Sequence, residues 1–266
     1  MFSTASHKLA MLFDTHTHLD QAEFDQTRDA VVERARTASV EAMIAVGTTA
    51  QASRKCVDLA ARYPGVFAAV GLQPNYIAEG DPSDWAEIER LASSPGVVAI
   101  GETGLDRHWH YTPFDQQQVF FQRHMELARR LDLPFIVHMR DSGDDILAAL
   151  REAHAHGPLH GVMHSFTGDA AMAAECMAMG MHISFAGMIT YKKSQALRDC
   201  AATIPTDRLL IETDCPYLSP EPVRSKRPNE PAFVRHTAAC LAATRGVTLE
   251  ELAAQTTANA RALFRR

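Results

Sequence analysis

Short apolar segments rich in β-branched residues alternate along this chain with longer segments whose apolar residues recur at helical spacing. The short segments, which predict strands, are Met11–Asp14, Ala42–Val46, Val66–Val70, Val97–Ile100, Phe135–Val137, Gly161–Met163, His182–Phe185 and Leu209–Ile211. The longer segments, which predict helices, are Thr27–Ala38, Gln51–Arg62, Asp84–Leu91, Pro113–Leu131, Asp144–Ala155, Ala170–Met179, Gln195–Ala202, Pro231–Arg245 and Leu249–Leu263. Because strands and helices alternate regularly, we expect parallel strands that are joined by right-handed crossovers.

The number of these units predicts a closed barrel. Eight strand–helix units within 266 residues fit a (β/α)8 barrel, which typically takes about 250 residues. We therefore predict an α/β fold, a TIM-type barrel forming one domain over residues 11–266, with its active site at the carboxyl ends of the strands. A doubly wound open sheet is the alternative, but such sheets usually have fewer strands, and no GxGxxG motif follows the first predicted strand.

Two segments fall outside this regular pattern. Residues 1–10 precede the first predicted strand, and we expect them to form a disordered extension. The longest irregular stretch, Tyr217–Glu230, follows the eighth strand and is rich in proline and basic residues. Long loops at the active-site end of a barrel are often functional, so this stretch is a candidate lid.

Composition and charge narrow the classes of function. The chain is 46% hydrophobic and 22% charged, without an apolar run near the roughly 20 residues of a membrane span. No secretory signal is recognisable, so we expect a cytoplasmic protein without membrane contact. Five cysteines without a CxxC pair predict free thiols rather than disulfides or a zinc knuckle. The net charge of −6 argues against a duplex-DNA coat protein, but not against a nucleic-acid enzyme whose site holds its own cations.

Histidines and carboxylates stand at the ends of five predicted strands. In chain order they are His16 with His18, Glu102, His138, His164 and Asp214. The strands of a barrel end at one mouth, and side chains two residues apart on a strand project to the same side. A lone histidine at a strand end is more often structural than a ligand. Six such side chains at one mouth instead predict a metal site.

The donor types and their number predict two ions. Imidazole and carboxylate together suit Zn, Mn, Fe or Ni, and they suit Mg less well. A catalytic zinc usually takes three protein ligands and a water, so six ligands exceed what one ion needs. We therefore predict two divalent cations per chain, about 3.5–4 Å apart as in two-metal hydrolytic sites. Glu102, which lies between the histidine groups in the sequence, is the expected bridge.

The motifs around these residues resemble a known family. DTHTHLD, VGLQP, GETGLD, PFIVHMRD, HSFTG and ETDCPYLSP, followed by PVRSKRPNEPAFV and TTANARALF, are similar to the TatD-like metal-dependent deoxyribonucleases of the amidohydrolase superfamily. The resemblance spans Met11 to Phe264 and implies a distorted barrel with two divalent cations. It assigns His16, His18, Glu102 and Asp214 to the first cation, and Glu102, His138 and His164 to the second.

The sequence departs from the family pattern at a few positions. Gln73 stands where the family usually has a histidine associated with substrate contact, and it can donate to a phosphate oxygen but cannot act as an acid. In the basic loop, Ser225 replaces a glycine and Pro228 is inserted. Thr103 replaces an isoleucine or valine, which we interpret as a packing change.

These residues predict a mechanism of phosphodiester cleavage. Glu102 would hold both cations, which would supply an activated water near neutral pH, and Asp214 would orient that water and accept its proton. Arg140, two residues after His138, would bind a phosphate with its fork of donors. Lys226 and Arg227 would hold the next phosphate of a single strand of DNA, the predicted substrate.

Other interpretations of the same residues stay open. His108 and His110 flank Trp109 and could stack on a nucleotide, although a structural role for this loop is the simpler interpretation. A C–N or lactone hydrolase is the main functional alternative, because the same metal pair can activate water against carbon. Such relatives often bridge their metals with a carboxylated lysine where this chain has Glu102. A silent nucleic-acid-binding or scaffold protein is a weaker alternative, and a monomer is the default expectation.

Overall fold

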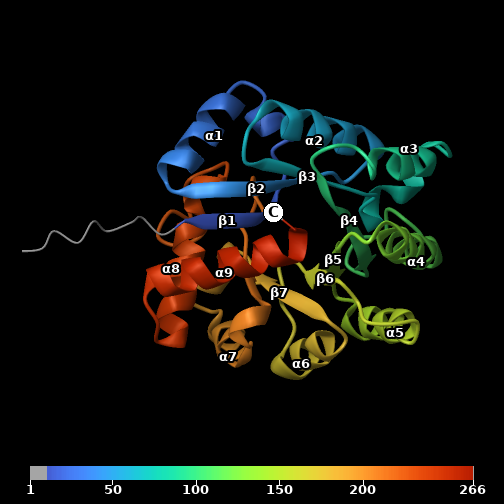
Figure 1. Cartoon of the computed structure of the whole chain (residues 1–266). Coiled ribbons are helices and arrows are strands. Elements are labelled where there is room, and N and C mark those ends of the chain that lie inside the picture. Colours follow the sequence, from blue (N-terminus) through green and yellow to red (C-terminus); the bar gives the residue numbers. More distant parts are fainter. Residues whose placement is uncertain (1–10, 266) are drawn as a thin grey trace, which may run out of the picture.

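Eight parallel strands form the centre of the molecule, and helices surround them (Figure 1). The computed structural model describes residues 11–265. The strands follow one another in chain order around the sheet and are β1 (Leu12–Thr17), β2 (Val40–Val46), β3 (Val66–Val70), β4 (Val97–Asp106), β5 (Phe135–Arg140), β6 (Gly161–Met163), β7 (Met181–Phe185) and β8 (Leu209–Ile211). The predicted single-domain (β/α)8 barrel is confirmed. The prediction for residues 1–10 lies outside the described residues.

The helices follow the strands as the pattern predicts. They are α1 (Arg28–Thr37), α2 (Ala50–Arg62), α3 (Asp84–Leu91), α4 (Phe114–Leu131), α5 (Gly143–His154), α6 (Ala170–Ala178), α7 (Gln195–Thr203), α8 (Val234–Arg245) and α9 (Leu249–Phe264). Within the described part of the chain, no helix combines the length and the apolar character that a membrane span requires. The five cysteines are free, as predicted.

The barrel closes between β1 and β8 through residues beyond the end of β8. Thr17 forms a parallel bridge with Cys215. The backbone N–H of Asp214 donates to the carbonyl of His16 at 3.0 Å, and the N–H of His18 donates to the carbonyl of Cys215 at 2.8 Å. The last strand and the first are therefore joined at the end of the barrel that carries His16, His18 and Asp214.

Helix α9 covers the opposite end of the barrel. Its residues Ala260, Leu263 and Phe264 belong to one buried cluster with inward-facing residues near the strand starts, such as Phe13 and Val98. The side chain of Asn259 donates to the carbonyls of Thr206 and Leu209, at the start of β8. Figure 1 shows α9 crossing in front of the strands, with the last turn of the helix near the barrel centre. The barrel is thus closed at this end and open at the carboxyl ends of its strands.

Strand β4 is longer than its pattern predicts. We expected it to end at Ile100, but it continues to Asp106. Beyond a shift of register after Ile100, it still pairs with β5, so that Gly104 lies opposite His138. A Cβ at Gly104 would lie 2.1 Å from the carbonyl oxygen of His138, and the residue has φ +132°. The polar GETGLD segment therefore extends the strand because glycine lets β4 and β5 approach closely.

Candidate metal centre

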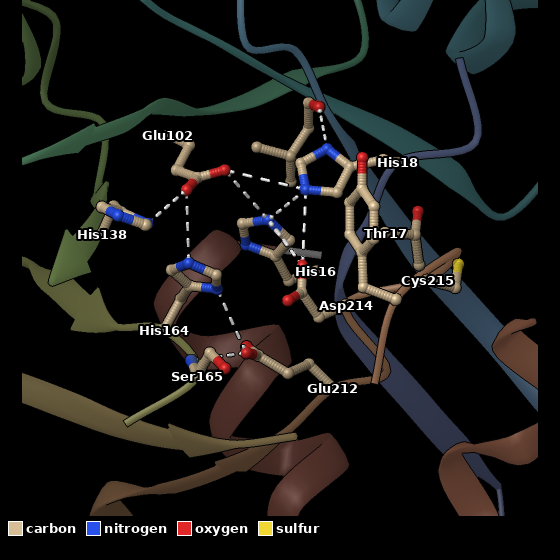
Figure 2. A network of polar contacts seen from close by, with 12 residues as sticks. His16, Thr17, His18, Glu102, His138, His164, Ser165, Glu212, Asp214 and Cys215 are labelled. Atoms are coloured by element: carbon tan, nitrogen blue, oxygen red, sulfur yellow. Dashed lines mark hydrogen bonds and ion pairs between the residues drawn. The ribbon is translucent and has the colours of Figure 1, made fainter. Parts of the chain in front are cut away.

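The six side chains that the sequence singled out meet at the carboxyl end of the barrel. Figure 2 shows them pointing toward one another from different parts of the barrel. They are His16 in β1, His18 just after it, Glu102 in β4, His138 in β5, His164 after β6 and Asp214 after β8. Four of them are buried, and the side chains of His138 and Asp214 keep exposed fractions of 16% and 13%. The structure therefore brings together every residue of the predicted ligand set.

Two imidazoles and two carboxylates form the first group of donor atoms. The Nε2 atoms of His16 and His18 are 3.2 Å apart. Glu102 Oε2 lies 3.5 and 3.7 Å from these two atoms, and Asp214 Oδ1 lies 3.8 and 3.4 Å from them. The ligand atoms of a tetrahedral zinc, bound at about 2.0–2.1 Å, are about 3.3–3.4 Å apart. The spacing of this group therefore fits one ion.

The other oxygen of Glu102 faces a second pair of imidazoles. Glu102 Oε1 lies 2.8 Å from His138 Nδ1 and 3.4 Å from His164 Nε2. One carboxylate thus contacts two groups of nitrogen atoms, each through a different oxygen. A carboxylate that bridges two ions has the same arrangement.

Three of the four histidines donate their outward nitrogen to a fixed oxygen. His18 Nδ1 lies 3.0 Å from the carbonyl of Val46, and His138 Nε2 lies 3.0 Å from Asp106 Oδ2. His164 Nδ1 lies 3.2 Å from Glu212 Oε1. An imidazole that donates outward keeps the lone pair of its inward nitrogen free, which is how metal-binding histidines are usually oriented.

The charges of the site also favour a cation. Burial raises the pKa of Glu102, but the charge of His164 and hydrogen bonds from His138 and His16 outweigh it and hold the pKa well below its usual range. Burial lowers the pKa of His18, yet the hydrogen bond to Asp214 and the charge of Glu102 raise it to about 9. Ionised carboxylates next to buried imidazoles thus attract positive charge. A divalent cation supplies that charge and accepts the free lone pairs, so the residues fit a metal.

Asp106 and Glu212 contact two of the predicted ligand histidines, and the sequence analysis assigned neither of them a role. Asp106 Oδ2 accepts from Asn75 Nδ2 at 2.8 Å as well as from His138. Glu212 Oε2 accepts from the hydroxyl of Ser184 at 2.6 Å. A signal was available, because Asp106 is four residues after Glu102 on β4, where side chains at even spacing share a face, and Glu212 is two residues before Asp214 in the sequence.

A third carboxylate fixes the chain around His16 and Asp214. Asp14 Oδ2 accepts from the hydroxyl of Thr213 at 2.6 Å, and Asp14 Oδ1 accepts from the Thr213 N–H at 2.9 Å. Asp214 itself has a φ of +55°, in the left-handed region that aspartate tolerates better than most residues. These bonds hold the turn after β8 against β1, where the two meet at the site.

A cavity of about 910 Å³ opens above the six side chains. Arg140 and Gln73, both predicted to contact substrate, line it. Lys226 and Arg227 are not among its lining residues, and Lys226 Nζ instead lies 5.6 Å from the centre of the Phe233 ring. Their role in substrate binding stays a prediction.

The candidate lid contributes little to this cavity. Of the segment Tyr217–Glu230, Tyr217 and Leu218 line the cavity. The buried side chain of Asn229 donates to the carbonyls of Thr213 and Tyr217, which ties the far end of the segment to the turn after β8. A role for this segment as a lid also stays a prediction.

Comparisons with known proteins agree on one family. The family model described as TatD related DNase matches residues 13–265. The chain is 41% identical to the metal-dependent hydrolase YabD of Bacillus subtilis over 96% of this chain and 99% of YabD. It is 38% identical to the 3′-5′ ssDNA/RNA exonuclease TatD of Erwinia amylovora over 95% and 99% of the two chains.

A solved structure gives the same result. The crystal structure of YJJV, a TatD homologue from Escherichia coli K12, superposes with a TM-score of 0.90 at 30% identity and covers 97% of this chain and 99% of its own. The family model matches nearly the whole described chain, and the relatives named above are 41% and 38% identical to it. This chain belongs to the TatD related DNase family of metal-dependent hydrolases.

Proposed function

We propose that this protein is a binuclear, divalent-metal-dependent phosphodiesterase that removes nucleotides from single-stranded DNA. The observation that carries the proposal is the position of Glu102, whose two oxygens face two separate histidine groups. His16, His18, Glu102 and Asp214 would hold one cation, and Glu102, His138 and His164 would hold the other. The names of the exonuclease relatives support a nucleic-acid substrate.

The cations would supply an activated water and polarise a phosphoryl oxygen of the substrate. The protein's own groups do the rest. Asp214 is ionised, because hydrogen bonding from His18 and the nearby histidine charges outweigh its burial and lower its pKa. It can therefore orient the water and accept its proton. Arg140, exposed at the end of β5, can bind a phosphate oxygen with its guanidinium, and the amide of Gln73 can donate to another.

The proposed site is complete within one chain. All six ligand side chains, and the two carboxylates behind His138 and His164, come from the same barrel. We therefore propose that the protein acts as a monomer, which light scattering at the concentration used for assays will test. A dimer whose dissociation abolishes activity would contradict this.

The test combines metal analysis with digestion of an end-labelled, single-stranded oligonucleotide. Purified protein is expected to carry close to two equivalents of transition metal, and a chelator should abolish digestion. The Glu102→Ala variant should lose both ions, whereas Asp214→Asn should keep the second ion and lose about 10²–10⁴-fold in turnover. Glu33→Gln, on an exposed helix face with its side chain 70% accessible, is the matched control and should behave as wild type.

The same assay separates this proposal from its alternatives. RNA, duplex DNA and a panel of amides and lactones are assayed as substrates in parallel. Preferred turnover of an amide or lactone would favour a C–N or lactone hydrolase. Digestion that survives chelation, or a fully active Glu102→Ala protein, would overturn the mechanism.

A further inference from the structure

Exposed aromatic rings gather around the cavity above the metal centre. Among the described residues, the large aromatic side chains that are exposed are Tyr76, Trp109, Tyr111 and Tyr217, at 41–58% exposure, and all four line this cavity. Exposing this much aromatic surface to water is unfavourable. A cluster of this kind confined to one cavity indicates a binding surface.

Two of these rings already form a stack. Trp109 and Tyr111, on the loop between β4 and α4, have ring centres 5.4 Å apart and planes inclined by 17°. The guanidinium carbon of Arg140 lies 5.6 Å from the centre of the Trp109 ring. Parallel rings beside a guanidinium are the features with which proteins bind unpaired nucleobases.

The position of this loop is tied to the metal centre through one carboxylate. Asp106 Oδ1 accepts from the backbone N–H of His108 at 2.8 Å and of Trp109 at 3.1 Å. Asp106 Oδ2 accepts from His138 Nε2 at 3.0 Å. The backbone at Trp109 is therefore held at a fixed place relative to His138, which suits a base-binding surface beside a scissile phosphate.

Few positively charged side chains line the cavity beside the metal centre. Among the described residues that line the cavity, Arg140 is the only lysine or arginine. Glu79 and Asp141 line it too, in addition to the carboxylates of the metal centre. Phosphates beyond the reach of the two proposed cations would therefore find few positive side chains, and stacking of the bases can supply the affinity that these contacts lack.

We propose that Trp109 and Tyr111, with Arg140 beside them, are a stacking platform for unpaired nucleobases of a single-stranded nucleic acid. This inference rests on the proposed function for the chemistry at the metals. Bases in a duplex are already stacked on one another and do not offer their faces to the platform, so it selects single strands. Every base has an aromatic face, so the platform has little sequence preference.

The test uses the fluorescence of Trp109 in the metal-loaded protein. The chain has two tryptophans, and Trp85 packs against Phe120 and His124 away from this cavity. A Trp85→Phe protein therefore reports on Trp109 alone. It is titrated with a phosphorothioate thymidine hexamer, which resists cleavage, and with an abasic hexamer of the same backbone. We expect the thymidine hexamer to quench the fluorescence and the abasic hexamer to bind weakly and without quenching.

Variants in the otherwise wild-type protein measure the contribution of the platform. With a dye-labelled thymidine hexamer, Trp109→Ala should weaken binding about 5- to 150-fold, whereas Trp109→Phe should retain most of the affinity. Val119→Ala, at an exposed apolar position outside the cavity, is the control and should bind as wild type. The Trp109→Ala protein should keep its melting temperature and both metal equivalents.

Equal affinity of the two hexamers, or wild-type affinity of Trp109→Ala, would overturn the platform. The proposed function and the platform can be refuted independently of each other. If the hexamer stacks on Trp109 but ordinary DNA is not cleaved, the platform stands and the nuclease proposal falls. If DNA is cleaved while abasic and thymidine hexamers bind alike, the nuclease stands and the platform falls.

Discussion

Acid should destabilise this protein through a histidine that lies outside the metal centre. His124, in the middle of α4, is fully buried. Its Nε2 accepts the backbone N–H of Leu72 at 3.0 Å, and its Nδ1 donates to the carbonyl of Phe120 at 2.6 Å. Both nitrogens are therefore used by the neutral ring, and burial lowers the pKa of His124 to about 4.

The sign and size of the effect follow from this shift. The unfolded chain binds the proton with a pKa of about 6.5, so between pH 6.5 and 4 it holds more protons than the folded chain. The stabilising contribution is thus fully present above pH 6.5 and is lost as the pH falls toward 4. Between pH 7.5 and 5.0 the loss is about 2 kcal/mol, and below pH 4 it approaches about 3.4 kcal/mol.

The assay compares the free energy of unfolding in urea for the wild type and for His124→Gln, at pH 7.5 and 5.0. Glutamine can accept the Leu72 N–H but does not titrate, so the wild type should lose about 2 kcal/mol more than the variant over this range. His182, whose pKa burial also lowers to about 4, titrates in both proteins and cancels in the comparison. Equal losses in the two proteins would refute the reasoning.

Two further substitutions test parts of the account that lie away from the ligands themselves. Glu212→Gln removes the carboxylate that orients His164, so the affinity of the second metal site should fall about 10- to 100-fold in competition titrations, while the first site is unchanged. An unaltered second site would show that Glu212 does not act through His164. Phe264→Ala removes a ring buried against Phe13 at the closed end of the barrel, so the free energy of unfolding in urea should fall by about 3–5 kcal/mol. A loss below about 1 kcal/mol would mean that α9 is not part of the core.

The sequence predicted the barrel because its signal repeats eight times and each repeat is independent of the others. It also predicted the meeting of His16, Glu102 and Asp214, because the ends of parallel strands in a barrel share one mouth. In both cases a local pattern and a general rule of topology were sufficient, and no particular long-range contact had to be known.

Other features depend on contacts that no local pattern contains. The continuation of β4 to Asp106 requires the close approach of Gly104 to β5, where polarity alone suggested a loop. The packing of α9 over the end of the barrel depends on the contacts of Phe264 with the strands. The apolar stripe of α9 does not show which surface of the protein the helix will cover. The sequence left two interpretations of the loop around Trp109 open, contact with a nucleotide by its flanking histidines and a structural role. The stacking of Trp109 on Tyr111 and its exposure into the cavity emerge only in three dimensions.

The claim on which the function depends is that Glu102 joins two metal ions. Anomalous diffraction from crystals of the metal-loaded protein measures this directly. We predict two peaks about 3.5–4 Å apart, one beside His16 and His18 and the other beside His138 and His164, with one Glu102 oxygen toward each. A single peak, or two peaks of which neither lies within coordination distance of Glu102, would contradict it.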